Sequence, residues 1–212
     1  MSAPPATSLD PDSRSLALDL AVTAVVVRLR TGRRWLPDLA TLPPALREPG
    51  ACFVTLTRAG ALLGCIGTLV PRDALGRDVA RNASAAAFDD PRLPAVTLAD
   101  VAAMDVHVSV LGPLEPLSVG GWDDLRRAVR PGTDGLLVEA PGHRGTLLPS
   151  VWRSLPDVEE FLDVLWRKAW LPAGDWPPGL AVHRYRTEEF GAPARDHHPA
   201  APPGARPPSS AR

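Results

Sequence analysis

Two short apolar segments separated by a tight link constrain the fold of this chain more than any other feature. Residues 51–57 (ACFVTLT) alternate between apolar and polar side chains, and residues 62–69 (LLGCIGTL) follow across Arg58-Ala59-Gly60-Ala61. A period of two is typical of a strand, and a short link containing glycine joins antiparallel neighbours. The segments therefore predict a β-hairpin. If its link has two residues, Cys65 lies opposite Val54, and Cys52 is only a diagonal neighbour too distant for a disulfide.

Helical patterns and further strand patterns surround this hairpin. Residues 13–30 and 73–88 carry apolar positions at helical spacing, and a third helix is predicted after Ser154, which begins a capping sequence. Strands are predicted at residues 103–111, 135–140, 146–148 and 181–185, with a turn at Pro141-Gly142. Hairpins mixed with separate helices indicate an α+β fold, in which a mostly antiparallel sheet is flanked by helices. The tryptophans are expected to build the core and its rim: Trp35, Trp122, Trp152, Trp166, Trp170 and Trp176.

Both ends of the chain differ in composition from its middle. Residues 1–12 carry three prolines, and residues 191–212 carry six prolines and no aromatic residue. Such segments bury too little apolar surface to offset their conformational entropy. We therefore expect a disordered N-terminal tail (1–12), one folded domain (13–190) and a disordered Pro/Ala-rich C-terminal tail (191–212).

The composition excludes several classes of protein. The formal net charge of −1 argues against binding nucleic acid through phosphate neutralisation. The N-terminus lacks the basic and apolar regions of a secretory signal, and no apolar run is long enough to span a bilayer. Two cysteines cannot form the disulfide framework of a small secreted domain. The expectation is a cytoplasmic protein with reduced thiols and no membrane association.

Three familiar kinds of site are not indicated. Asp105, His107 and Ser109 share one face of a predicted strand, but successive residues on that face are ~6.6 Å apart, too far for a nucleophile and its base. The chain contains no metal-binding motif, and adjacent His197 and His198 fall in the predicted tail. It also lacks the glycine-rich phosphate-binding loops. We therefore expect neither a triad on this strand, nor a metal, nor a cofactor.

Cys65 lies between Gly64 and Gly67 in an apolar strand, and it is the more informative thiol. Glycine inside a strand marks a bulge or a close approach by a backbone or a ligand, which suits an accessible nucleophile. The alternative is a small buried apolar side chain, the commonest role of a free cysteine. Reactivity also requires an electropositive neighbour, which the sequence does not identify.

Two further polar residues stand on apolar helical stripes. Asn82 is beside Leu75 and Val79, where its amide either ties the helix to nearby backbone or lines a pocket. Lys168 is the only lysine of the chain and stands at the edge of an apolar stripe. Its stem covers the core while its amine reaches solvent, or it supplies a titratable amine to a site.

Several motifs together resemble the AMMECR family. Residues 62–68 (LLGCIGT) are similar to its signature, whose usual form is Leu-Arg-Gly-Cys-Ile-Gly, so that Leu63 stands where arginine is usual. Ser150, where glutamine is common, is a milder departure. The likeness runs from about residue 14 to Phe190, through residues 85–92 (AAAFDDPR), 108–111 (VSVL), 131–136 (PGTDGL), 144–152 (RGTLLPSVW) and 161–169 (FLDVLWRKA).

The resemblance implies an antiparallel sheet flanked by helices, with a smaller subdomain inserted between chain-end portions of a larger one. Bacterial and archaeal members are known as the A protein of the AmmeMemoRadiSam system. This implies association with a Memo-like protein and a radical S-adenosylmethionine protein. The resemblance supplies no reaction.

Two hypotheses follow. In the first, the chain is an accessory or substrate-handling subunit that acts with those two proteins in a modification pathway. In the second, it is an enzyme whose nucleophile is Cys65 and whose substrate is a small molecule or a modified biopolymer. Its candidate ligand-binding residues are Gly64, Gly67, Asn82, Ser109, Arg144 and Lys168. A ligand-binding or RNA-associated module is a third possibility, and the charge balance disfavours RNA.

Overall fold

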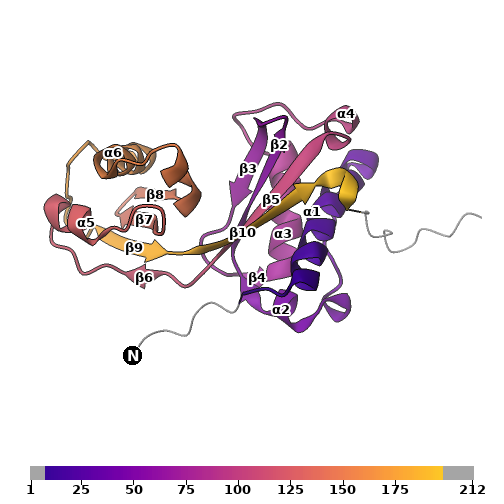
Figure 1. Cartoon of the computed structure of the whole chain (residues 1–212), viewed down its shortest axis with the longest axis horizontal. Helices are drawn as coiled ribbons and strands as arrows, with labels where there is room; N and C mark the ends of the chain where they lie inside the picture. The colour runs from indigo at the N-terminus through magenta and orange to yellow at the C-terminus, as the bar shows by residue number, and fades with distance from the viewer. Residues whose placement is uncertain (1–7, 198–212) are drawn as a thin grey trace, which may run out of the picture. The chain divides into compact units, whose positions relative to one another are not determined.

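The computed structural model describes residues 8–197, which form two compact units (Figure 1). The smaller unit is Leu111–Glu188, and the larger unit consists of residues 8–110 and 189–197. The smaller unit is thus inserted between two chain-end portions of the larger one. This arrangement and the mixed helix and strand content confirm the predicted α+β fold.

The ordered elements extend beyond residues 13–190. Helix α1 (Pro11–Thr31) begins at Pro11, where the Asp10 side chain accepts a hydrogen bond from the Ser13 N–H and caps the first turn. The last strand, β10 (Thr187–Pro193), extends to Pro193 and leads into η3 (Ala194–Asp196). Residues 11–12 and 191–196 therefore lie in regular elements, although the sequence assigns them to tails. The remainder of the predicted tails, residues 1–7 and 198–212 with His198, lies outside the described residues.

A four-stranded sheet with the order β10-β5-β2-β3 forms the centre of the larger unit. Strands β2 (Cys52–Arg58) and β3 (Ala61–Gly67) form the predicted hairpin, and β5 (Met104–Leu111) pairs antiparallel with β2. Ala59 and Gly60 close the hairpin with φ of 49° and 81°. Positive φ at both positions is the requirement of a type I′ turn, which follows the twist of the strands.

A register shift in this hairpin corrects one prediction. Leu56 pairs with Gly64 and Thr57 with Leu62, so Leu63 is an extra residue without a partner on β2. Beyond this bulge the pairing moves by one residue, and Cys65 faces Thr55 instead of Val54. Because side chains alternate along a strand, the shift determines which residues share a face with the thiol.

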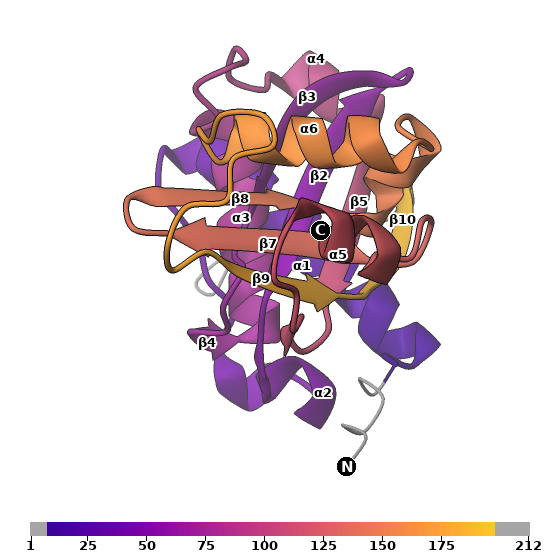
Figure 2. The ribbon, with the colours of Figure 1, turned by 90° about the vertical axis from the view of Figure 1, so that its left-hand side faces the viewer.

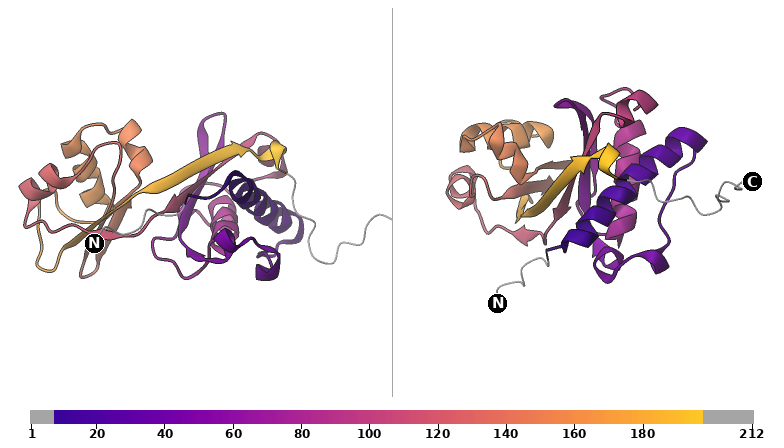
Figure 3. Two further views of the ribbon diagram at one scale, coloured as in Figure 1. Left: turned by 60° about the horizontal axis from the view of Figure 1, so that its bottom comes forward. Right: turned by 45° about the vertical axis from the view of Figure 1, so that its right-hand side comes forward.

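Helix α3 (Leu75–Phe88) packs on one face of this sheet, and α1 packs against α3 (Figure 3). The face of the sheet toward the helices is apolar. Alternate residues of β2 and β5 are buried there with both helices, including Val54, Leu56, Val106, Val108, Val22, Val25 and Val79. The valine-rich half of α1 is helical despite weak propensity because this burial surrounds it.

Short elements complete the larger unit. They are η1 (Leu39–Thr41), α2 (Pro44–Arg47), the two-stranded pair β1 (Pro49–Gly50) and β4 (Asp73–Ala74), and α4 (Leu98–Val101). Thr97 and Asp100 form a capping box at the start of α4.

The smaller unit contains a second antiparallel sheet with the order β6-β9-β7-β8. Its strands are β6 (Glu115–Pro116), β7 (Gly135–Ala140), β8 (His143–Leu147) and β9 (Ala181–Tyr185). Figure 2 shows β9, β7 and β8 side by side. Helix α6 (Val158–Lys168) packs on β8 and β7, and α5 (Trp122–Ala128) and η2 (Pro149–Arg153) belong to the same unit. Its core is aromatic: Trp152 stacks on Phe161 at 3.7 Å, and Trp122 meets Trp166 edge-on at 4.8 Å between ring centroids.

Two predictions about α6 are wrong. Its N-cap is Asp157, whose side chain accepts a hydrogen bond from the Glu160 N–H, and Ser154 instead donates to the Val151 carbonyl. Trp170 is not a core residue, because 85% of its surface is exposed. It follows the C-cap Ala169 and has a φ of 60°, a left-handed conformation outside the helix.

Candidate functional site

Cys65 lies on β3, the edge strand of the larger sheet, with its side chain on the face opposite α3. The Thr55 hydroxyl donates a hydrogen bond to Cys65 Sγ at 3.2 Å. The backbone N–H and C=O of Cys65 bond to other groups and point away from β2, so Cys65 and Thr55 form a non-hydrogen-bonded pair. Side chains approach most closely in such pairs, which explains the contact between hydroxyl and thiol.

Asp90 and Arg92 bind the backbone of Cys65 from the loop after α3. Asp90 Oδ2 accepts the Cys65 N–H at 3.0 Å, and Arg92 Nη2 donates to the Cys65 carbonyl at 3.1 Å. The two side chains also form a bidentate pair, with contacts of 2.9 and 2.7 Å. The hydrogen bonds from Arg92, followed by the Cys65 N–H, hold the pKa of the buried Asp90 carboxyl well below its usual range. The bond to Asp90 likewise raises the pKa of Arg92.

These contacts take the place of a neighbouring strand at the sheet edge. An edge strand presents unpaired N–H and C=O groups, and covering them blocks pairing with another chain. Here a carboxylate covers the N–H and a guanidinium covers the C=O of the same residue. Leu63, where the family signature usually has arginine, packs against the apolar core instead. Arg92, four-tenths buried, is thus a cation beside the signature strand, and it contacts the carbonyl of Cys65.

Close packing within the larger unit explains why glycine is required at positions 64 and 67. A Cβ at Gly64 would lie 1.9 Å from the Ala86 carbonyl oxygen of α3, and a Cβ at Gly67 would lie 2.2 Å from the Phe53 ring. Glycine in these positions allows a helix backbone and an aromatic ring to approach the strand. The glycine pattern did predict close approach, and the approaching groups belong to the protein itself.

Asn82 ties α3 to the sheet. Its amide donates to the Cys52 carbonyl at 3.0 Å, to Thr68 Oγ1 at 3.1 Å and to Asp78 Oδ2 at 2.9 Å. Asp78 is fully buried, accepts the Cys52 N–H at 3.1 Å and pairs with Arg81 at 3.1 Å. Burial, followed by the charge of Asp78, raises the pKa of the Cys52 thiol well above its ordinary value. These contacts agree with the hypothesis that the Asn82 amide ties the helix to nearby backbone.

Sequence reasoning does not identify Asp78, Asp90, Arg92 or Thr55, although residues 85–92 resemble a family motif. Each acts through a contact between segments at least ten residues apart. A buried Asp in a helix and an Asp-Pro-Arg sequence after it are the signals that could have pointed to them.

Ser109 and Cys65 share one face of the larger sheet, the face opposite α3, which is named the open face. It pairs with Phe53 on β2, one position along the face from the row formed by Cys65, Thr55 and His107. His107 is exposed, and its Nδ1 would lie 2.4 Å from a Cβ at Gly191, so the imidazole leans over β10 and away from Thr55. Cys65, Thr55 and His107 therefore lie on one face, where Thr55 bonds to the thiol and the imidazole points elsewhere.

Arg144 and Lys168 belong to the smaller unit. Arg144 Nε pairs with Glu139 at 3.0 Å across β7 and β8, and Lys168 is exposed in the last turn of α6. Within the larger unit, Gly67 and Ser109 share a sheet face with Cys65, whereas Gly64 and Asn82 lie on the side of α3.

Residues 8–197 offer neither a clustered metal site nor a helix that could span a membrane. They contain no cluster of three or more His, Cys, Asp or Glu side chains arranged to hold a metal ion. None of the helices in that range has the length and apolarity required to cross a bilayer.

Comparisons with known proteins agree with the motifs. The AMMECR1 family model matches residues 18–190. A protein of Methanothermobacter thermautotrophicus is 38% identical over 189 residues, covering 86% of this chain and 95% of its own length. The crystal structure of uncharacterized protein PH0010 from Pyrococcus horikoshii superposes with a TM-score of 0.80 at 35% identity, covering 86% of this chain and 93% of that one. Both relatives are archaeal. With its signature strand, its fold and these matches in agreement, the chain belongs to the AMMECR1 family.

Proposed function

We propose that the protein is a substrate-handling subunit that acts with a Memo-like protein and a radical S-adenosylmethionine enzyme in a modification pathway. The observation that carries this proposal is the use made of Asp90 and Arg92. Both charged groups bind the backbone of the signature strand and so fix the position of Cys65. The partner of Cys65 Sγ is the hydroxyl of Thr55, a group that does not act as a general base at neutral pH.

In this proposal, the open face of the larger sheet is the surface that binds the partner proteins or their substrate. It presents an exposed imidazole at His107 and half-buried polar groups at Thr55, Cys65 and Ser109. Gly67 and Gly191 leave parts of this face without side chains. A rigid strand surface with mixed polar groups is suited to holding a partner or its substrate in a fixed orientation.

We place this role in the cytoplasm, in keeping with free thiols at Cys52 and Cys65.

The test is co-purification with the two proposed partners from a cell that contains all three proteins. Wild-type protein and Cys65→Ser are expected to retain both partners, whereas Ser109→Arg, which places a bulky charge on the open face, is expected to lose them. Arg127→Gln changes an exposed side chain of the smaller unit and serves as the control. Recovery of the wild-type protein alone under gentle conditions, with both partners present, contradicts the proposal.

A second function, catalysis by Cys65, is favoured by the same contact between Thr55 and the thiol. The hydroxyl fixes the direction of a partly exposed Sγ on the open face, as a nucleophile toward a small molecule or modified biopolymer would require. The discriminating measurement is the rate of alkylation of Cys65 compared with the same thiol in the denatured chain. A rate no faster in the folded protein rules out the nucleophile.

A further inference from the structure

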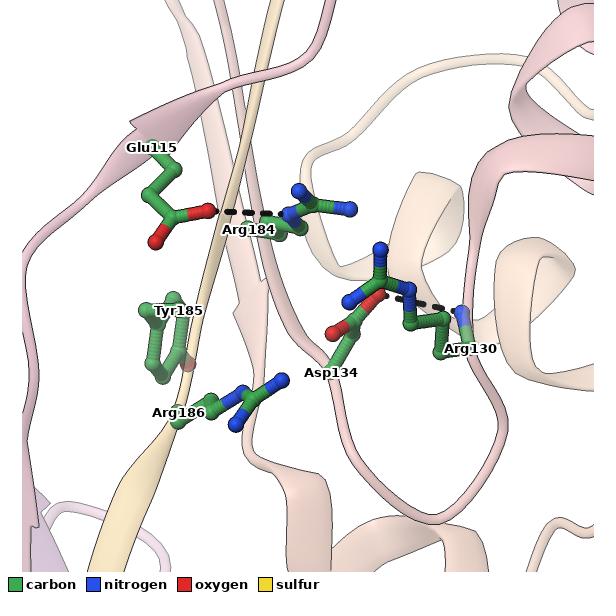
Figure 4. Close-up of a pocket in the computed structure, with 6 residues that line it drawn as sticks. All are labelled: Glu115, Arg130, Asp134, Arg184, Tyr185 and Arg186. Carbon is green, nitrogen blue, oxygen red and sulfur yellow. Dashed lines mark hydrogen bonds and ion pairs between the residues drawn. The ribbon is translucent and has the colours of Figure 1, made fainter. Parts of the chain in front are cut away.

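A small cavity in the smaller unit is surrounded by arginines that the proposed function does not use (Figure 4). Its volume is about 40 Å³. Since one water requires ~10–15 Å³ by this measure, the space holds about three or four waters or one small oxyanion. The lining residues are Glu115, Arg130, Asp134, Arg184, Tyr185 and Arg186.

The loop between α5 and β7 fixes one side of the cavity. Asp134 Oδ2 accepts the backbone N–H of Arg130 at 3.0 Å, and the N–H groups of Thr133 and Asp134 both bond to the Arg130 carbonyl. Gly132 adopts a φ of 75°, the left-handed conformation that this tight loop requires. The loop therefore holds the backbone of Arg130 in place before any ligand arrives.

The charges around the cavity are unbalanced. Arg184 donates to Glu115 at 3.1 Å, and Asp134 is occupied by the backbone of its own loop. The guanidinium groups of Arg130 and Arg186 form no hydrogen bond or ion pair with any residue between 8 and 197. Figure 4 shows the three guanidinium groups directed toward the space beside Asp134. Three cations thus face two carboxylates, and two of the cations have their donors available.

We propose that this cavity binds a phosphate group. Guanidinium groups recognise oxyanions through forked pairs of N–H donors. Three forks, one from the loop after α5 and two from the end of β9 and the residue after it, match a tetrahedral dianion, which offers an oxygen to each, better than a planar carboxylate with two oxygens. Arg130 lies far in the sequence from Arg184 and Arg186, so no single phosphate-binding motif would reveal the three together. The proposal is independent of the partners proposed above, and its failure would leave them untouched.

The test is titration of the full-length protein with inorganic phosphate at constant ionic strength, followed by calorimetry and by the NMR signals of the arginine Nε–H groups. Methyl phosphate forms a second arm, because it shows whether the cavity accepts a phosphate ester or only the free anion. Acetate at the same ionic strength forms a third. We expect saturable binding of phosphate, shifts confined to the lining arginines, and binding of acetate at least tenfold weaker.

Two variants make the test specific. Arg130→Gln and Arg186→Gln are each expected to weaken phosphate binding by about tenfold or more, since each removes a charged hydrogen-bond donor. Arg127→Gln, which removes an exposed arginine paired with Asp124 outside the cavity, is expected to bind as the wild type does. Arg186→Lys retains the charge and loses the fork, and should bind with intermediate affinity. Absence of saturable binding, or equal weakening by Arg127→Gln, overturns the proposal, provided that circular dichroism shows each variant folded.

Discussion

The carboxylate of Asp90 accepts the backbone N–H of Cys65 at 3.0 Å, although the two residues are 25 positions apart. This bond joins the loop after α3 to the edge of the sheet. It is reinforced by Arg92, which pairs with Asp90 and donates to the carbonyl of the same cysteine. The family signature and the Asp-Pro-Arg motif are therefore two halves of one structural device.

Replacing Asp90 with asparagine should reduce the stability of the larger unit. We expect the free energy of unfolding to fall by ~1.5–3 kcal/mol, the range for a hydrogen bond to a charged group, because Arg92 loses its ion pair. Urea unfolding followed by circular dichroism measures the effect. Glu48→Gln makes the same chemical change at an exposed position and should alter stability by less than about 0.5 kcal/mol. Equal effects of the two substitutions would contradict the role of Asp90.

The same carboxylate should make stability depend on acid pH. Because the folded pKa of Asp90 is depressed, its contribution is complete above the unfolded value of ~3.9 and is lost as the pH falls through the folded value. We therefore expect the urea midpoint to decline from about pH 4 downward. Asp90→Asn should flatten this decline, with a residual slope from Asp89, whose pKa is lowered by Arg28. Parallel profiles for wild type and variant would count against this account.

Gly64→Ala should be strongly destabilising. The added methyl group would lie 1.9 Å from a backbone carbonyl oxygen, which cannot rotate away, so β3 must separate from α3. We expect a loss of ~2–3 kcal/mol, at the upper end of the usual range for overpacking. Gly121→Ala, at an extended position with open space around it, should be close to neutral in the same thermal unfolding experiment. A neutral Gly64→Ala would show that the strand and helix are not in close contact.

Trp170→Gly should increase stability. Trp170 occupies the left-handed position after α6, where its N–H bonds to Arg167 and the next N–H, of Leu171, bonds to Trp166. Glycine avoids the strain of this conformation, and the exposed ring loses little burial. We expect a gain of ~0.5–1 kcal/mol, measured by circular dichroism in urea. Trp170→Ala retains the strain and should show no such gain. A loss of stability on Trp170→Gly would instead mean that the ring makes a stabilising contact.

The two thiols should differ in reactivity toward a thiol-exchange reagent. Cys52 has no exposed surface, and its pKa is raised by burial and by Asp78, so it should react only as the chain unfolds. Cys65 is partly exposed and should react in the folded protein. The number of thiols labelled before unfolding is expected to be one in the wild type and none in Cys65→Ser. Rapid labelling of Cys65→Ser would mean that Cys52 is accessible.

Local patterns were sufficient to predict several of the longer regular elements. The helix at residues 13–30, the hairpin around Gly60 and the strand at 103–111 all form close to their predicted bounds. Each depends on periodicity, capping or turn chemistry within a few residues. Strand β10 was missed because its sequence, Thr187–Pro193, contains glycine and proline and becomes a strand by pairing with β5.

The chain sequence by itself determined the α+β class, the hairpin, the free thiols and the family, because these follow from short-range patterns and motifs. Only the tertiary structure decided what surrounds Cys65. One extra residue, Leu63, moved the register so that the thiol faces Thr55, and the α3 loop then brought Asp90 and Arg92 to its backbone. A bulge and a contact across 25 residues leave no local periodicity in the sequence. They exist because the sheet edge must satisfy its hydrogen bonds and the helix must pack against glycine.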